Sequence, residues 1–202
     1  MQNSIESTLI TEKKKKQISA TEPDWEREKF ERWWSPSRQL LKSIRQYQKW
    51  EKKGGIFAKF FQKIHIFEHR FWSVVSGADI PINCQLGGGL RLTHPNGVVI
   101  HPLAKIGCNC LILQQVTITN GVEIGGHVDI GAGAKILKET KIGDHAKIGA
   151  NAVVVCDIPA GAIAVGVPAR ILSAKQSNSS EPASNSENNL DTDSVYCSDQ
   201  ES

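Results

Sequence analysis

Aromatic side chains are missing from most of this chain. All five tryptophans and all six phenylalanines lie at or before Trp72, and no Phe, Trp or Tyr occurs between Ser73 and Val195. This abrupt change near residue 76 indicates that two different architectures are joined there. We expect the second one to have an interior that leaves no room for a ring.

Long apolar runs and paired cysteines are missing as well. No run of 18 apolar residues occurs, so no transmembrane helix is expected. The five cysteines include no CxxC pair and have no histidine at zinc-finger spacing, which argues against a bound metal. Their number is odd and no secretion signal precedes them, so we expect free thiols in a reducing cytoplasm.

The net charge of +3 conceals an asymmetry along the chain. Residues 1–72 hold 16 Lys and Arg against 9 Asp and Glu, whereas the remaining residues hold 8 against 12. A basic half could favour an acidic partner or weak association with a membrane surface, although a solvated helix surface is the simpler interpretation. No nucleic-acid partner is expected.

The composition divides the chain into four parts. Residues 1–22, with a KKKK run at 13–16, are predicted to be a disordered basic arm, and the Ser- and Asn-rich residues 173–202 a disordered acidic tail. Residues 23–76 show helical patterning, with Ser35 as a candidate N-cap before Pro36 and a break at Lys53-Gly54-Gly55. Residues 77–172 form the fourth part.

The second predicted helix carries an aromatic stripe on one side. Its apolar residues are Phe57, Phe60, Phe61, Ile64, Phe67, Phe71, Trp72 and Val75. A basic helix with such a face could lie on a membrane. We favour the alternative that the stripe packs on the next domain.

A six-residue period runs through the third quarter of the chain. Aliphatic residues recur at Ile100, Ile106, Ile112, Ile118, Ile124, Ile130, Ile136, Ile142, Ile148 and Val154. Four residues after each comes a small or medium side chain: Ala104, Cys110, Val116, Val122, Val128, Ala134, Thr140, Ala146, Ala152 and Ile158. Glycine often follows the aliphatic residue, which suits a corner because positive φ costs glycine little. The period predicts a parallel β-helix, in which three hexads make one coil.

The period slips once between Ile80 and Val154. Hexads also start at Ile80, Leu86 and Leu92, but Leu92 and Ile100 are eight residues apart, across the stretch RLTHPNGVVIHP. His94, Gln114, Ala132 and Ala150 all occupy the third position of a hexad, so we expect them along one edge of the β-helix. Pro95-Asn96-Gly97 supplies the turn residues that such a slip needs.

These repeats resemble the hexapeptide-repeat acyltransferases, and the likeness ends in AVGVPARIL (Ala164–Leu172), which is similar to the closing signature of that family. Within the family the chain resembles the serine acetyltransferases, because DIPINCQLGGGLRLTHPNG runs from Asp79 to His94 at their spacing and continues in an H-x-x-G context. The resemblance implies a mainly β fold: a left-handed parallel β-helix, preceded here by a short α-helical region and flanked by the disordered tails. It also implies a homotrimer.

The resemblance also implies an acetyl-CoA-dependent O-acetyltransferase, with L-serine as first candidate acceptor and cysteine biosynthesis as its pathway. His94 would be the general base, since imidazole titrates near neutral pH, and Asp79 would orient its ring. Ala132 and Ala150 match positions whose backbone contacts coenzyme A in related acetyltransferases, and Gln114 continues their edge. Arg170 would meet the nucleotide phosphates, although capping the last coil is an alternative.

The chain departs from serine acetyltransferases in ways that keep other functions open. The basic loop that would hold a serine carboxylate is missing from VTITNGVEIGG, and Thr93 replaces the usual acid before the histidine. The chain ends in Ser202 rather than isoleucine, so no cysteine-synthase complex is expected. A sugar hydroxyl, as in exopolysaccharide or capsule synthesis, is therefore the alternative acceptor.

The remaining histidines support weaker interpretations. His101 is a rival base, because it replaces the usual small residue after the aliphatic position. His127 and His145 are separated by one full coil and should stack with Asn109, which predicts a surface ladder rather than a metal site. A non-catalytic β-helix scaffold or a carbonic-anhydrase-like metalloprotein is the alternative from another functional class.

Overall fold

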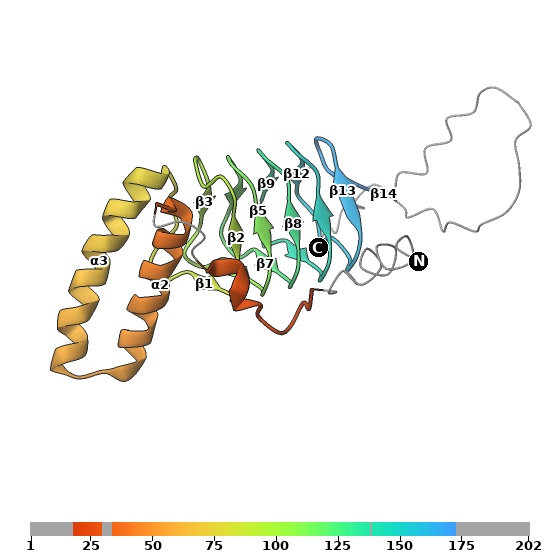
Figure 1. The fold of residues 1–202 in the computed structure, drawn as a ribbon. Coiled ribbons are helices and arrows are strands. Elements are labelled where there is room, and N and C mark those ends of the chain that lie inside the picture. The colour runs from red at the N-terminus through yellow and green to blue at the C-terminus, as the bar shows by residue number, and fades with distance from the viewer. Residues whose placement is uncertain (1–17, 30–33, 138, 173–202) are drawn as a thin grey trace, which may run out of the picture.

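The computed structural model describes residues 18–29, 34–137 and 139–172, so most of both predicted tails lies outside the described residues (Figure 1). The 3-10 helix η1 (Trp25–Glu28) comes first, followed by the α-helices α2 (Pro36–Lys53) and α3 (Ile56–Ser76). Ser35 is the N-cap of α2 and Pro36 its first residue, and Gly54 ends it. The predicted pair of helices with a break between them is therefore confirmed.

Short strands, parallel except for the final β13–β14 pair, make up the rest of the described chain. They are β1 (Gln85–Leu86), β2 (Arg91–Leu92), β3 (Val99–Ile100), β4 (Lys105–Ile106), β5 (Leu111–Ile112), β6 (Thr117–Ile118), β7 (Glu123–Ile124), β8 (Asp129–Ile130), β9 (Lys135–Ile136), β10 (Lys141–Ile142), β11 (Lys147–Ile148), β12 (Val153–Val154), β13 (Ile163–Val165) and β14 (Arg170–Leu172). From β1 to β12, strands three places apart in the chain pair with one another, and β13 and β14 extend one of the three sheets that result: β1-β4-β7-β10, β2-β5-β8-β11-β13-β14 and β3-β6-β9-β12. A three-sided parallel β-helix results, with α2 and α3 at one end (Figure 1).

The strand register confirms both the three-hexad coil and the slip. Val99 pairs with Thr117, and Lys105 with Glu123, so each partner lies three hexads further along the chain. Pairs that span the slip are separated by two more positions, as in Leu92 with Ile112. A second change lies beyond Val154, where Ile142 pairs with Ile158, two positions short of a full coil. Ile158 therefore takes an aliphatic strand position rather than the fifth position that we predicted for it.

The interior is filled by the two predicted columns of side chains. Strand residues such as Ile112 and Ile136 are fully buried, and so are fifth-position residues such as Val116 and Ala134. Burying an aliphatic side chain contributes roughly 1.5–3 kcal/mol, so the stacked columns supply most of the driving force for the fold. Neither column offers the width that a ring needs, which accounts for the missing aromatics.

Glycine is required after the aliphatic residue for a different reason from the positive φ that we predicted. Gly107 and Gly131 do not have positive φ. A Cβ at Gly107 would lie 2.5 Å from the carbonyl carbon of Gly125, and one at Gly131 would lie 2.5 Å from the backbone nitrogen of Ala150. These glycines are required because the next coil passes too close for any side chain. Positive φ occurs two residues after the glycine position, as at Asn109 and Gln115.

The two helices cover the first coil unequally. Leu40, Leu41 and Ile44 of α2 are buried in the same core as the β-helix interior. The aromatic stripe of α3 does not pack on the β-helix as we expected, because Phe57 and Phe67 are 82% and 77% exposed and, of the stripe's rings, Trp72 alone packs against the core. Neither α2 nor α3, nor any other helix in the described residues, has the length and apolar character that crossing a bilayer requires.

Residues 18–29 run along one corner of the β-helix, so residues 18–22 of the predicted arm are held in place. The fully buried Asn109 accepts a hydrogen bond from the Asp24 N–H (2.7 Å) and donates to the carbonyls of Ser19 and Glu22 (both 2.7 Å). Arg27 donates to the Asn109 carbonyl (2.6 Å). We call residues 18–29 the strap.

The described cysteines differ in oxidation state. Cys84, Cys108 and Cys110 are free thiols, as we expected. Cys156 is disulfide-bonded, so the expectation of free thiols is wrong for that residue. Cys84 and Cys110 point into the interior, and burial raises the pKa of their thiols to about 12 and about 11.

Candidate active site

The two-residue slip lies at the corner between β2 and β3. The N–H of Gln115 donates to the Asn96 carbonyl (3.0 Å), and in the next coil the N–H of Gly133 donates to the Gln114 carbonyl (2.9 Å). Asn96 therefore stacks beneath Gln114, and the extra residues are within 93–95. His94 shares the predicted edge but stands in the insertion, not in the stacked column.

This insertion puts His94 on the surface of a cavity of about 510 Å³. Its walls come from the strap (Arg27), from the start of α2 (Ser35, Ser37, Arg38 and Leu41) and from the β2 corner (Leu90, Arg91, Leu92, Thr93 and His94). The sequence alone does not reveal that the strap and α2 reach this corner. Arg27, Arg38, Arg91 and the two serines are the site residues that sequence reasoning missed.

Asp79 lies one coil before β3, opposite its first residue, Val99. It forms a parallel bridge with Val99, its N–H donates to the Val98 carbonyl (2.8 Å), and its carbonyl accepts from the Ile100 N–H (3.0 Å). Asp79 and His94 are both exposed. Among the described residues, no hydrogen bond joins the side chains of this predicted pair.

The predicted cofactor edge continues upward from the cavity. The N–H of Asn151 donates to the Ala132 carbonyl (2.8 Å), so the corner that holds Ala150 stacks on Ala132, and Ala132 stacks on Gln114. Two of these three residues are alanines, so their side chains add only methyl groups to this edge. Arg170 is exposed in β14, at the end of the β-helix away from α2 and α3. This strand belongs to the sheet of β2, β5, β8 and β11, and the residues of the predicted edge follow β5, β8 and β11.

The other histidines lie at other corners. His101 follows β3, and its Nδ1 accepts the N–H of Leu103 (3.2 Å), so it stabilises a turn away from the cavity. His127 and His145 stack as predicted, with their Nδ1 atoms 2.8 Å apart. Burial, and secondarily His145, lowers the pKa of His127, although Asp129 opposes this shift. No group of three or more potential metal ligands occurs in the described part of the chain.

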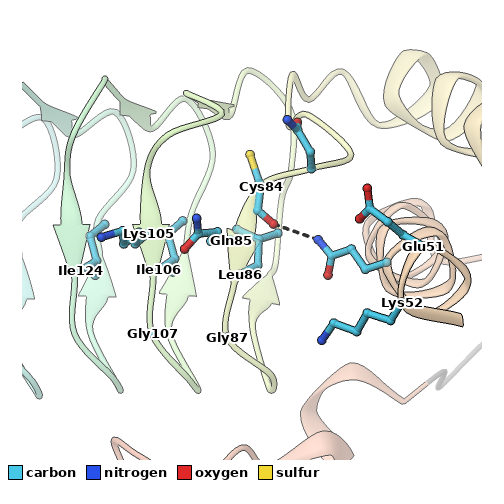
Figure 2. A pocket seen from close by; sticks show the side chains of 12 residues that line it. Glu51, Lys52, Cys84, Gln85, Leu86, Gly87, Lys105, Ile106, Gly107 and Ile124 are labelled. Carbon is cyan, nitrogen blue, oxygen red and sulfur yellow. Dashed lines mark hydrogen bonds between the residues drawn. The ribbon is translucent and has the colours of Figure 1, made fainter. Parts of the chain in front are cut away.

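Two further cavities lie along the sheet that contains β1, β4, β7 and β10. Figure 2 shows the first, of about 540 Å³, where Glu51 and Lys52 of α2 face Cys84, Gln85 and Leu86. Gln48 closes one side of it by donating from Nε2 to the Cys84 carbonyl (2.9 Å). The second, of about 680 Å³, lies between β4 and the residues after β10. Neither is lined by a histidine, whereas the cavity at the slip contains a potential general base.

Comparison with known proteins gives concordant matches. Residues 103–138 match the family described as bacterial transferase hexapeptide (six repeats). A serine acetyltransferase of Mycobacterium tuberculosis is 37% identical over 120 residues, covering 55% of this chain and 52% of that protein. One from Haemophilus influenzae is 34% identical over 158 residues, covering 74% and 58%. The chain spans about half the length of the curated relatives that it matches.

Solved structures agree with the sequence relatives. Soybean serine acetyltransferase apoenzyme superposes with a TM-score of 0.57 at 32% identity, covering 68% of this chain and 57% of that one. A serine acetyltransferase in complex with CoA has a TM-score of 0.59 at 31% identity, covering 69% and 58%. These likenesses confirm the predicted left-handed parallel β-helix.

Proposed function

We propose that this chain, a hexapeptide-repeat protein of the serine acetyltransferase type, transfers the acetyl group of acetyl-CoA to the hydroxyl of L-serine, as cysteine biosynthesis requires. The observation that carries the proposal is a histidine in the single two-residue insertion of the β-helix, beside a cavity. Solved relatives include serine acetyltransferase complexes with serine and with CoA, which supports both substrates.

His94 acts as the general base in this reaction. It takes the proton of the acceptor hydroxyl while that oxygen attacks the carbonyl carbon of the acetyl thioester. When the tetrahedral intermediate collapses, the carbon–sulfur bond breaks, and the imidazolium returns the proton to the coenzyme A thiolate. The nucleophile is the acceptor oxygen itself, so the mechanism uses no cysteine of this chain.

Asp79 stabilises the charged form of His94 and orients its ring. Both side chains are exposed, and Asp79 lies opposite Val99, at the start of the strand that follows the insertion. Apo geometry with a missing catalytic hydrogen bond is common, because these bonds tighten in the Michaelis complex.

Coenzyme A lies along the edge of Gln114, Ala132 and Ala150. Small side chains at this corner let an extended pantetheine arm approach the backbone, and the edge leads to the insertion that holds His94. Arg170 meets the nucleotide phosphates, which suits a guanidinium. Acetyl-CoA is consumed as co-substrate.

A sugar hydroxyl is the second candidate acceptor. The observation that favours it is the uninterrupted passage from β6 to β7, which carries no loop with basic groups for an amino acid. The same base and the same thioester would serve this reaction, so only the acceptor distinguishes the two candidates.

We also propose that the protein is a cytoplasmic homotrimer. The relatives' fold supports this assembly, and an exposed apolar face on α3 offers a surface that a second copy or a membrane could cover.

Release of coenzyme A from acetyl-CoA by the purified protein tests the function. The protein is assayed with L-serine and with a panel of neutral sugars, and the acetylated product is identified by mass spectrometry. We expect turnover with L-serine and formation of O-acetylserine. Turnover with a sugar alone would select the second candidate, and no thiol release with any acceptor would favour the scaffold alternative.

A further inference from the structure

Helix α3 has an apolar side that no other described element covers. It packs against α2 through its opposite side, where Ala58 is buried and Phe61 stacks on Trp50 with ring centroids 4.5 Å apart. In Figure 1, α2 lies between most of α3 and the β-helix, so the uncovered side of α3 points away from the rest of the described chain. The side chains on it are between 45% and 87% exposed: Ile56, Phe57, Phe60, Ile64, Phe67, Phe71 and Val74. We call these residues the apolar face of α3.

The apolar face forms one continuous stripe along the helix. From Phe57 to Val74 its residues are separated alternately by three and four positions, which at about 100° per residue keeps them on one side of the helix. Most of its side chains are phenyl rings. Leu, Ile and Val are the usual residues at a coiled-coil seam, whereas Phe is typical of helices that lie in the interface of a bilayer.

Basic side chains border the apolar face. Lys59, Lys63 and Arg70 are exposed, and at about 100° per residue they fall together along one flank of the stripe. The acidic residue of α3, Glu68, is half-buried, and its carboxylate lies 3.0 Å from Nδ1 of His65. Residues 36–76, which contain both helices, hold nine Lys and Arg against two Asp and Glu. The surface around the apolar face is therefore strongly positive.

This charge pattern favours one kind of occupant over another. A second copy of α3 would bring its own cations towards the same positive surface, and none of the described residues of α3 is an exposed acid that could pair with them. An anionic bilayer is complementary in both respects, because its acyl chains accept phenyl rings and its headgroups attract Lys and Arg. Long basic side chains at the edge of an inserted face can extend to the headgroups.

We propose that α3 is an interfacial helix that attaches the protein to an anionic phospholipid surface. Its apolar face inserts at the boundary between headgroups and acyl chains, and Lys59, Lys63 and Arg70 contact the headgroups. The inference goes beyond the acetyl transfer and does not depend on it, and the negative inner surface of a membrane suits the proposed cytoplasmic location. In the proposed homotrimer, a threefold axis holds the copies of α3 at the same height, so a single bilayer can bind more than one of them.

Co-sedimentation of the full chain with lipid vesicles tests the inference. Vesicles of phosphatidylcholine alone are compared with vesicles of phosphatidylcholine and phosphatidylglycerol in equal parts, each at low and at high salt. The variants are Phe67→Gln, within the apolar face, and the double variant Lys59→Gln/Lys63→Gln, on its flank. These side chains are exposed, so both variants are expected to fold, which circular dichroism checks.

Matched controls lie towards the other end of the β-helix. Val155→Gln replaces an apolar side chain that is 51% exposed just after β12. The double variant Lys141→Gln/Lys147→Gln removes two exposed lysines, one each from β10 and β11. Each control therefore makes the same kind of chemical change away from α3.

We expect the wild-type protein to bind the mixed vesicles at low salt, to bind them less at high salt, and to bind phosphatidylcholine weakly. Phe67→Gln should lower the partition coefficient about 10- to 100-fold, because one ring no longer leaves water. Lys59→Gln/Lys63→Gln should lower it about 30-fold on the mixed vesicles, since each cation near an anionic surface contributes about fivefold. Both controls should bind like the wild type.

Three results would overturn the inference. If the wild-type protein fails to bind the mixed vesicles at low salt, α3 has no affinity for an anionic bilayer. If both α3 variants bind as well as the wild type, another basic segment carries the affinity, such as the KKKK run at 13–16. If Phe67→Gln lowers the mass measured by light scattering and leaves vesicle binding unchanged, a second copy of the chain covers this face.

Discussion

Asn109 shows how much a single side chain contributes here. It adopts a left-handed conformation (φ 61°), which asparagine tolerates well, and it is the fully buried polar residue to which the strap is attached. By fixing the strap, it also fixes Arg27 at the cavity beside His94. A residue that the sequence presents as one step of a surface ladder therefore positions part of the cavity wall beside His94.

Removing the Asn109 side chain should release the strap. Asn109→Gly keeps the backbone conformation but loses three hydrogen bonds, at about 1 kcal/mol each, so amide exchange across residues 18–29 should quicken by roughly two orders of magnitude. Hydrogen exchange with mass spectrometry measures this. Gln115→Gly, at the positive-φ position of another corner, is the control and should leave the strap protected.

His127 should make the fold sensitive to mild acid. Burial lowers its folded-state pKa, so the unfolded chain takes up a proton more readily than the folded one as the pH falls through about 6.5. Stability is therefore lost on going from about pH 7.5 to 5.5. His127→Asn should reduce this loss, because asparagine suits the left-handed position and does not titrate. Thermal unfolding midpoints at both pH values provide the measurement; an unchanged pH dependence would contradict the assignment.

At the scale of elements, the backbone geometry at the corners determines which residue types each coil can have there. Glycine at the position after the aliphatic residue allows neighbouring coils to touch through their backbones, whereas Asn, His, Gln or Gly occupies most of the positive-φ positions that follow. Sequence periodicity predicts where the corners are. It does not distinguish these two reasons for a small or flexible residue, because that distinction depends on the distance between coils.

Replacing a glycine that lies against the backbone of the next coil should push the two coils apart. Gly107→Ala puts a Cβ 2.5 Å from the Gly125 carbonyl carbon, and such overpacking costs about 2–3 kcal/mol. Gly161→Ala, where the same atom meets open space but φ is +71°, should cost only about 1 kcal/mol from backbone strain. Urea unfolding compares the two variants. Equal losses would show that close contact between coils is not the constraint.

Much of the site could be predicted because the repeat is strict. The three-hexad register locates His94 at the same corner as Gln114, Ala132 and Ala150, and the slip is visible as one irregular spacing. The stacking of Asn96 rather than His94 on Gln114 could not be read from the spacing, since a two-residue insertion can fall anywhere within its hexad. The cavity arginines escaped prediction because the strap and α2 reach the corner through tertiary contacts, which have no periodicity.

At the scale of the whole molecule, the β-helix and helix α3 differ in how far their apolar side chains are buried. The β-helix buries the aliphatic residues of its two interior columns, while α3 leaves Phe57, Phe60 and Phe67 more than 60% exposed. Exposed aromatic surface of this extent is unusual for a protein that acts as a monomer. The unpartnered face therefore agrees with the proposed assembly of several chains.

The assembly should be visible in solution. Light scattering coupled to size exclusion is expected to give about three times the 22.2 kDa of one chain. Phe67→Gln on the exposed face of α3 tests whether this helix contributes, and it should not unfold the subunit because the side chain is 77% exposed. A mass of one chain for the wild type would contradict the trimer.

The most direct test of the central claim is the rate of coenzyme A release from acetyl-CoA and L-serine by the His94→Asn variant. Because His94 is exposed, the substitution should leave the fold intact, which thermal unfolding verifies. General-base catalysis predicts a fall in kcat of about 10²- to 10⁴-fold with an unchanged unfolding midpoint. A variant as active as the wild type would show that the histidine in the slip is not the base.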